Sequence, residues 1–330
     1  MSPKPKPAPD PAHLGPRLRL GVSRCLLGDE VRYDGQHKRD EFLVDVLGPY
    51  VEWLPVCPEV EIGLPIPRES LRLVGDPAAP RLVAPRSGAD HTDRMRTWAA
   101  ARLDGLAAED LVGFVFKKDS PSSGLFRVKV YGAQGMPART GSGIFARAFT
   151  ERFPDLPVEE EGRLHDWRLR ENFVERIFAV ARWQGLLRDN PTPAGLVAFH
   201  AAIKLTLLAH SPAHYTELGR LVAGAGRTPW PELTVRYFGR LMDGLKALAT
   251  PRKHANVFHH LMGFLKDHLD AGDKAELLAA VQEYRDGLVP HIVPFTLLRH
   301  HLAKHPVGDW VRRQTYLNPY PKEMMLRNHV

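Results

Sequence analysis

Two patterns of hydrophobic and polar residues divide this chain. From residue 17 to about residue 157, short apolar runs alternate with amphipathic segments, which is typical of strands separated by helices. After residue 158, apolar residues such as Phe173, Ile177 and Val180 recur every three or four positions, which is typical of helices. We therefore predict an α/β domain with a mainly parallel, Rossmann-like sheet, followed by an all-α domain.

The pattern also predicts the individual elements of both domains. The run Leu111–Phe116 is apolar throughout, as expected for a strand that is buried on both faces. Strands are expected at 18–23, 51–56, 111–116 and 127–131, and helices between them at 42–47, 92–108 and 136–153. The helices of the second domain are expected at 193–210, 212–224, 231–249, 254–270, 273–287 and 294–305, after a first amphipathic stripe that includes Trp167.

Composition adds limits to this two-domain picture. Residues 1–16 are rich in proline and lysine and lack the apolar stretch of a secretion signal, so we expect a disordered tail before domains at 17–157 and 158–330. We find no apolar run long enough to cross a bilayer, and we expect no membrane association. The chain has 2 cysteines, which excludes a disulfide framework and favours a cytoplasmic location. The oligomeric state is left open.

The chain is moderately basic. A formal net charge of +7 and a pI of about 9.4 fit a polyanionic partner such as RNA, although a solvated basic surface gives the same values. In the second half, cations and aromatic residues alternate, which permits either stacking platforms for RNA or core aromatics beside solvated cations. These residues are Lys204, Arg252, Lys253, Arg285 and Arg299, with Tyr237, Phe238, Phe258 and Tyr284.

Histidines are frequent in the second half, but their spacing does not match a recognised metal-binding set. We interpret most of them as surface or core polar residues of the helices, with metal binding as a minor alternative. They are His254, His259, His260, His268, His291, His300, His301 and His305.

Three predicted strands of the first domain are followed by residues with reactive or ionisable side chains. They are Cys25, the Cys57-Pro58-Glu59 segment and the loop 120–124. Because ligands bind beyond the carboxyl ends of parallel strands, these residues are expected to form one site. Two cysteines alone are better explained as small buried hydrophobic residues, but their positions directly after strands favour a cleft.

The loop after Cys25 adds positive charge, a phenol and two glycines to the same edge. Arg32 and Arg39 are candidates to neutralise a thiolate or another anion, and Tyr33 lies between them. A simpler interpretation is that Asp34-Gly35 is a turn and Arg32 a surface charge.

Several sequence motifs now acquire a common explanation. The segments RCLLGDEVRYDG, VCPE and KKDSPSSGLFRV resemble the three signature motifs of the thiouracil desulfurase family. The segments KHANVFHHLMGFLK, YRDGLVPHIVPFTLLRHHL and LRNHV resemble the helical domain that is often fused to it. The combination, from about residue 17 to the C-terminus, is similar to desulfurases of 4-thiouridine in tRNA, whose helical domain assists RNA binding.

This resemblance implies a [4Fe–4S] cluster on three cysteines, with the fourth iron open to accept sulfur. Two of the ligands correspond to Cys25 and Cys57, and the third falls on Ser123, where the family has a cysteine. A serine oxygen is a poorer ligand for such clusters than a thiolate. The chain thus combines a family-like site with an altered third ligand.

The resemblance also implies roles for the neighbouring side chains. Glu59 matches the family's catalytic acid and Ser120 its catalytic serine, while Arg32, Tyr33 and Ser122 are expected to bind substrate. Without the resemblance, a surface glutamate and a helix-capping serine would be the preferred explanations of Glu59 and Ser120.

Three functions follow from these assignments. The favoured one is iron–sulfur-dependent desulfuration of a thiolated uracil, with 4-thiouridine in tRNA as the expected substrate, replacing C=S by C=O. The second is an inactive protein that binds tRNA or a nucleotide, because Ser123 replaces a cluster cysteine. The third is an enzyme for free thiouracil, whose helical domain serves dimerisation.

Overall fold

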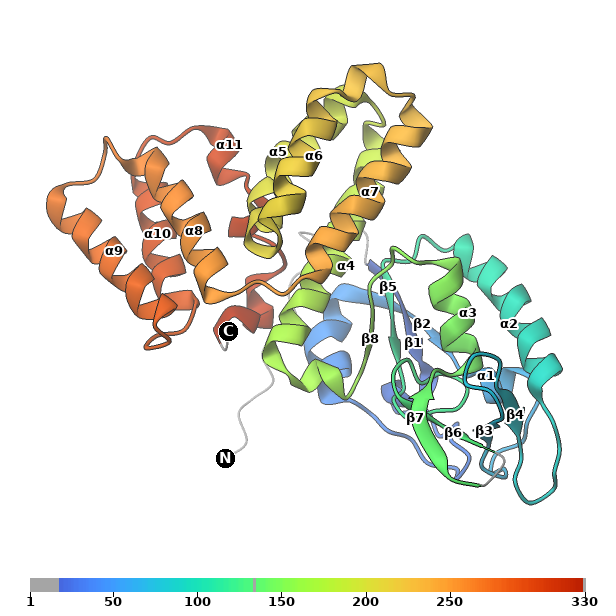
Figure 1. The fold of residues 1–330 in the computed structure, drawn as a ribbon. Coiled ribbons are helices and arrows are strands. Elements are labelled where there is room, and N and C mark those ends of the chain that lie inside the picture. The colour runs from blue at the N-terminus through green and yellow to red at the C-terminus, as the bar shows by residue number, and fades with distance from the viewer. Residues whose placement is uncertain (1–17, 133–134, 329–330) are drawn as a thin grey trace. The chain divides into compact units, whose positions relative to one another are not determined.

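The structure is a computed structural model that describes residues 18–132 and 135–328 (Figure 1). The disordered tail predicted for residues 1–16 lies outside the described residues. The chain divides into two compact units, the first ending at His165 and the second beginning at Asp166. Each unit is described below by itself.

The first unit is built on a four-stranded sheet in the order β2-β1-β5-β8, and all its strands are parallel. The strands are β1 (Leu18–Ser23), β2 (Val51–Val56), β5 (Gly113–Phe116) and β8 (Val158–Glu160). The predicted α/β architecture with a mainly parallel sheet is therefore confirmed. Strand β8 pairs with β5, so residues 158–160, which the sequence analysis placed in the second domain, complete the sheet of the first unit.

One face of this sheet packs on helices α2 (Thr92–Ala107) and α3 (Ile144–Arg152), which Figure 1 shows side by side. The fully buried rings of Phe114 and Phe145 are the centre of the contact, with centroids 5.8 Å apart in an edge-to-face arrangement. Gly21 is required beneath them, because a Cβ atom there would lie 2.2 Å from the Phe114 ring. The core thus fixes β1 and β5 at a close separation.

A second sheet, which the sequence analysis did not predict, lies in the same unit. Its order is β4-β3-β6-β7, and only the β3–β6 pair is parallel. Strands of three residues are too short to show a period of two, and this explains why β3 and β4 were missed. The strands are β3 (Arg72–Val74), β4 (Arg81–Val83), β6 (Val128–Tyr131) and β7 (Pro137–Gly141).

The predicted helix over 136–153 is wrong in its first part, because β7 occupies Pro137–Gly141 and α3 begins at Ile144. Gly141 lies so close to β6 that a Cβ atom would come within 2.5 Å of a methyl group of Val130. The glycine that allows this close pairing also interrupts the helical pattern.

Short helical elements connect the strands of the first unit. The predicted helix at 42–47 is a π-helix, η3 (Phe42–Leu47), which continues into η4 (Gly48–Tyr50). The elements η2 (Arg24–Leu27), α1 (Pro58–Glu61) and η5 (Arg163–His165) follow β1, β2 and β8, respectively.

The second unit is helical, as predicted, and contains no strand among its described residues. Threonine, serine or aspartate caps five of its helices among the described residues, and proline follows three of these caps, at Thr192-Pro193, Ser211-Pro212 and Thr250-Pro251. The helices are α4 (Trp167–Asp189), α5 (Pro193–His210), α6 (Pro212–Ala223), α7 (Trp230–Lys246), α8 (Pro251–Met262), α9 (Ala271–Arg285), α10 (Ile292–Lys304) and α11 (Asp309–Arg312). The short turns are η6 (Ala225–Arg227), η7 (Gly263–Leu265), η8 (Thr315–Leu317), η9 (Lys322–Met324) and η10 (Leu326–Asn328).

Helix α5 is the most apolar helix of this unit. Among the described residues it alone is long and apolar enough to cross a membrane, and 56% of it is buried inside the protein. The side chains of Ile203, Leu205 and Leu207 are almost fully buried, which is typical of the core helix of a helical bundle.

A buried ionic network closes the second unit near the end of the chain. The guanidinium of Arg327 donates to Glu171 Oε1 at 3.1 Å and to Glu175 Oε1 at 3.2 Å. The hydroxyl of Tyr320 donates to Glu171 at 2.7 Å, and His210 Nε2 lies 2.8 Å from Glu175 Oε2. The network joins α4, α5 and the C-terminal segment and satisfies charges that are almost fully buried.

The network stabilises the ionised form of Glu175. Burial opposes ionisation, but the hydrogen bond and charge of His210, together with Arg327, lower the pKa of Glu175 to about 2. The motif LRNHV singled out in the sequence therefore contributes its arginine to the core.

Candidate active site

The structure places a pocket of about 320 Å³ at the carboxyl edge of the parallel sheet, where β1, β2 and β5 end. All eight site residues predicted from the sequence line it, together with Arg68 and Lys117, which were not predicted. The predicted residues are Cys25, Arg32, Tyr33, Cys57, Glu59, Ser120, Ser122 and Ser123.

The two cysteines are positioned by the turns that follow β1 and β2. Cys25 lies in η2, where its carbonyl accepts a hydrogen bond from Lys38 N at 2.9 Å. Cys57 immediately precedes α1, and its backbone N–H donates to Glu61 Oε1 at 3.0 Å. The Cys57 thiol donates to the carbonyl of Val31 at 3.8 Å. Both thiols therefore face the pocket from fixed backbone positions.

The loop Ser120–Gly124 folds around the hydroxyl of its first serine. Ser120 Oγ accepts hydrogen bonds from the backbone N–H groups of Ser122, at 3.3 Å, and Ser123, at 3.1 Å. Gly124 N donates to Ser120 O at 2.7 Å, and a Cβ atom on Gly124 would approach this oxygen to 2.7 Å. Only glycine therefore fits the end of this tight turn.

Helix α3 holds the same loop from the other side. Its first N–H groups, on Ile144 and Phe145, donate to the carbonyls of Pro121 and Ser122 at 3.3 and 2.9 Å. Gly143 permits this approach, because a Cβ atom there would lie 2.4 Å from the Ser122 backbone. The loop thus uses the unpaired N–H groups at the start of α3 to fix its own shape.

A continuous hydrogen-bond chain runs along the pocket wall from the loop to α1. Ser120 Oγ and Ser122 Oγ are 3.0 Å apart, and Ser122 Oγ donates to Glu59 Oε1 at 2.8 Å. Since Ser120 Oγ already accepts two N–H groups, its own proton is directed to Ser122. The chain Ser120–Ser122–Glu59 can therefore transfer protons between the loop and a carboxylate.

Arg68 completes this chain and was missed by the sequence analysis. Its guanidinium binds Glu59 Oε2 through two nitrogens, with Nε at 3.2 Å, and also donates to the Val31 carbonyl at 3.0 Å. The Arg68 side chain is 4% exposed and that of Glu59 15%. The pair is nine positions apart in sequence, and no regular element lies between the end of α1 and Arg68, so no local pattern could have revealed it.

Comparison with known proteins gives a family match for each part of the chain. The 2-thiouracil desulfurase family matches residues 20–161, and DUF1722, a family of unknown function, matches residues 204–321. The chain is 31% identical over 164 residues to "Uncharacterized protein YbgA" of Escherichia coli (strain K12), covering 49% of this chain and 95% of YbgA. The first part of this chain is a domain of the 2-thiouracil desulfurase family, and the second part contains a DUF1722 domain.

A solved structure is also similar to the chain. It is the "[4Fe-4S]-dependent thiouracil desulfidase TudS", which is 32% identical and covers 46% of this chain and 95% of its own, with a TM-score of 0.38.

The donor atoms of the desulfurase domain match a three-cysteine cluster only in part. Burial raises the pKa of Cys25 to about 12 and also raises the pKa of Cys57, so both are thiols until a metal displaces the proton. The chain holds 2 cysteines, and Ser123, at the third position, is 4% exposed and offers a hydroxyl. These residues therefore do not supply the three thiolates of such a cluster.

The loop after Cys25 brings only part of its predicted charge to the desulfurase pocket. Arg32 lines the pocket and pairs with Asp34 through two contacts of 3.2 and 3.1 Å. Tyr33 lies beside it and is 45% exposed, so its ring is accessible from solvent. The expectation for Arg39 is wrong, because Arg39 pairs with Asp45 at 2.6 Å and is absent from the pocket lining.

Lys117 is the second pocket residue that the sequence analysis missed. It directly follows β5, and its ammonium lies 2.5 Å from Glu161 Oε1. Its charge acts on Cys25 and partly offsets the effect of burial on the thiol. The sequence could have revealed Lys117, because it directly follows a buried strand. The same reasoning identified Cys25 and Cys57.

In the DUF1722 domain, most of the aromatic residues considered for RNA stacking belong to the core. Tyr237 and Phe258 are fully buried and Tyr284 is 4% exposed, while the half-buried Phe238 stacks on Trp183. Lys253 donates to the carbonyls of His210 and Leu248. For these aromatic residues, the alternative that they pack in the core and do not stack on RNA is confirmed.

Proposed function

We propose that this protein removes the sulfur of a thiolated uracil, replacing C=S by C=O, in the pocket at the edge of the parallel sheet. The observation that carries the proposal is the hydrogen-bond chain Ser120–Ser122–Glu59, which lines the same pocket as two cysteine thiols. The match of the 2-thiouracil desulfurase family to residues 20–161 supports the choice of substrate.

The reaction consumes one water and releases one hydrogen sulfide, so it needs no external oxidant or reductant. Glu59 accepts the proton of the attacking water, directly or through Ser122, and returns a proton to the departing sulfur. Arg68 holds the carboxylate in place and leaves Glu59 Oε1 facing the serine chain. Arg32 and Tyr33, which also line the pocket, contact the base.

Iron–sulfur dependence is the cofactor part of the proposal. Cys25 and Cys57 are the residues that would bind a cluster, with Ser123 at the third position. The similar protein TudS is described as [4Fe-4S]-dependent, which supports a sulfur-accepting group in this position. Because the chain lacks the third thiolate, the steps above use only its own side chains.

Anaerobic preparation followed by iron and sulfide analysis tests the cofactor, and loss of the thiocarbonyl absorbance tests the reaction. We expect Ser123→Cys to hold at least as much iron as the natural sequence. If neither protein holds iron or consumes thiouracil, the proposal fails.

The proposed natural substrate is 4-thiouridine in tRNA, supported by the net charge of +7 and by the attached DUF1722 domain. Comparing thiolated tRNA with free thiouracil at equal concentrations tests this choice. A higher kcat/KM for the free base would instead assign the enzyme to small molecules, with the helical unit serving dimerisation.

A second candidate function is supported by Ser123. A chain that lacks one cluster ligand can retain the pocket and bind tRNA or a nucleotide without converting it. Salt-dependent tRNA binding together with unchanged thiouridine content would favour this function.

A further inference from the structure

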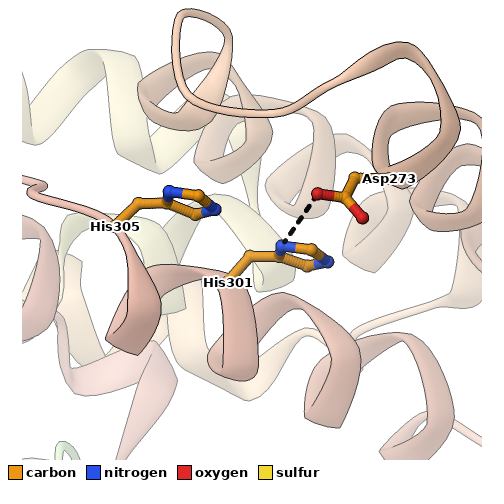
Figure 2. Close-up of side chains that lie close together, drawn as sticks. All are labelled: Asp273, His301 and His305. Atoms are coloured by element: carbon orange, nitrogen blue, oxygen red, sulfur yellow. Dashed lines mark ion pairs between the residues drawn. The ribbon is translucent and has the colours of Figure 1, made fainter.

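Two histidines and an aspartate of the second unit converge where α9 begins and α10 ends (Figure 2). His301 is in the last turn of α10 and His305 caps it, while Asp273 is in the first turn of α9. One ligand atom from each of the three residues lies within 4.8 Å of the other two. Figure 2 shows the two imidazole rings on the same side of α10, with the Asp273 carboxylate above His301.

Two ring nitrogens in this cluster are buried without a hydrogen-bond partner, namely His301 Nδ1 and His305 Nε2. His301 Nδ1 is 4.0 Å from Asp273 Oδ2, which is too long for a hydrogen bond. The residue His301 is 3% exposed. Buried polar atoms are normally paired, and leaving one unpaired costs about 1–3 kcal/mol, so this arrangement needs an explanation.

The helix dipoles explain the positions of the three residues along α9 and α10 but not the arrangement of the two rings. A carboxylate in the first turn of α9 is favoured by the helix dipole, and histidines in the last turn of α10 are favoured for the same reason. This effect does not require the two rings to stack in parallel, as they do with an interplanar angle of 4° and centroids 5.9 Å apart. It also does not pair the two buried nitrogens.

We propose that Asp273, His301 and His305 bind a divalent transition-metal ion of the Zn²⁺ class. Histidines four residues apart on a helix and one carboxylate are a common ligand set for such ions. With metal–ligand bonds of about 2.1 Å, tetrahedral ligands are about 3.4 Å apart, so small side-chain rotations close the observed gaps. The ion satisfies both unpaired nitrogens and offsets the aspartate charge.

The site leaves at least one coordination position for water or a further ligand. His268 is a candidate for this position, because its ring stacks on His305 with centroids 5.8 Å apart and its side chain is exposed. The bound ion links the start of α9 to the end of α10 and thereby stabilises this part of the helical unit. The proposal concerns the second unit and is independent of the desulfurase pocket.

The test is a calorimetric titration of the metal-free full-length protein with Zn²⁺. Because the thiols of Cys25 and Cys57 are competing donors of the type that zinc prefers, the same titration is made with Cys57→Ser, which removes a pocket donor only. Asp273→Asn and His305→Ala are expected to weaken the helical site at least tenfold. His300→Ala is the matched control, because His300 is exposed on the same turn of α10 and is not part of the cluster.

Thermal unfolding provides a second measurement on the same proteins. Zn²⁺ is expected to raise the Tm of the natural sequence and of Cys57→Ser, and to leave the Tm unchanged when Asp273→Asn is combined with Cys57→Ser. The proposal is overturned if Cys57→Ser binds no zinc at micromolar concentrations. It is also overturned if Asp273→Asn and His305→Ala bind as tightly as His300→Ala, since this would place the ion elsewhere.

Discussion

Each unit of this protein contains a carboxylate held by an arginine, but the two assemblies differ in what they leave free. In the second unit, Arg327 contacts Oε1 of both Glu171 and Glu175. Tyr320 donates to the same oxygen of Glu171, and His210 lies against the other oxygen of Glu175. In the first unit, Arg68 holds one oxygen of Glu59, and the other accepts a hydrogen bond from a serine that lines a pocket.

This difference distinguishes an ion pair that stabilises the fold from an ion pair whose carboxylate can take part in a reaction. A fully enclosed network contributes to one folded arrangement, and losing a partner leaves a buried charge unpaired. A carboxylate with one oxygen linked to a serine chain at a pocket can accept and return protons. We therefore expect substitutions in the first assembly to affect the reaction, and substitutions in the second to affect stability.

The largest expected effect is on catalysis, from Glu59→Gln. The amide keeps the shape of the side chain but cannot accept a proton, so desulfuration should fall by about 10²–10⁴-fold. The measurement is the initial rate of thiocarbonyl loss. Glu52→Gln, which changes an exposed carboxylate on β2, is the control and should retain full activity. Equal rates for both variants would remove Glu59 from the mechanism.

The next effect is on stability, from Arg327→Met. This change leaves Glu171 and Glu175 buried without their cation, which should cost about 3–5 kcal/mol of unfolding free energy. Urea unfolding followed by circular dichroism measures it. Arg240→Met is the control, because its pair with Glu217 is exposed and should contribute at most about 1 kcal/mol. Similar losses for both variants would contradict the structural role of the buried network.

A smaller effect is expected from pH. Burial lowers the pKa of His200 to about 4 and that of His254 to about 3, below the usual value of 6.5. The stability contributed by these neutral histidines is fully present above pH 6.5 and is lost as the pH falls towards 4. At pH 5, each of these two histidines should lower the free energy of unfolding by about 2 kcal/mol relative to pH 8. Urea midpoints at both pH values measure the change, and an unchanged midpoint would exclude buried neutral histidines.

The smallest effect is expected from Ser122→Ala, which interrupts the chain between Ser120 and Glu59. Glu59 remains and can act through water, so the rate should fall by about tenfold, with little change in KM. Ser87→Ala, on the surface of the same unit, is the control. If Ser122→Ala raised KM alone, Ser122 would bind substrate and not transfer protons.

The sequence was most informative where one strand or helix determines a position. Cys25, Cys57 and loop 120–124 follow parallel strands, so topology alone brought them to one edge. Helix α5 matched its predicted bounds, because Thr192 and the following proline mark its start. Strand β7 was missed because its residues show no alternation, and Gly141 acts through a close contact with another strand.

Pairs of distant side chains could not be predicted from the sequence. Arg68 meets Glu59 through an irregular segment, and Arg327 reaches Glu175 across 152 positions. Asp273 and His301 come from different helices, so only the fold brings them together. The resemblance identified the desulfurase motifs, but it did not reveal which charged partner fixes the carboxylate.

The most direct test of the account is sulfide release by anaerobically prepared full-length protein given a thiolated uracil. We predict one sulfide released for each thiocarbonyl lost, with the rates of both signals at least about a hundredfold lower in Glu59→Gln. Absence of both signals in the natural sequence and in Ser123→Cys, each loaded with iron and sulfide, would contradict the assignment of the pocket as a desulfurase site.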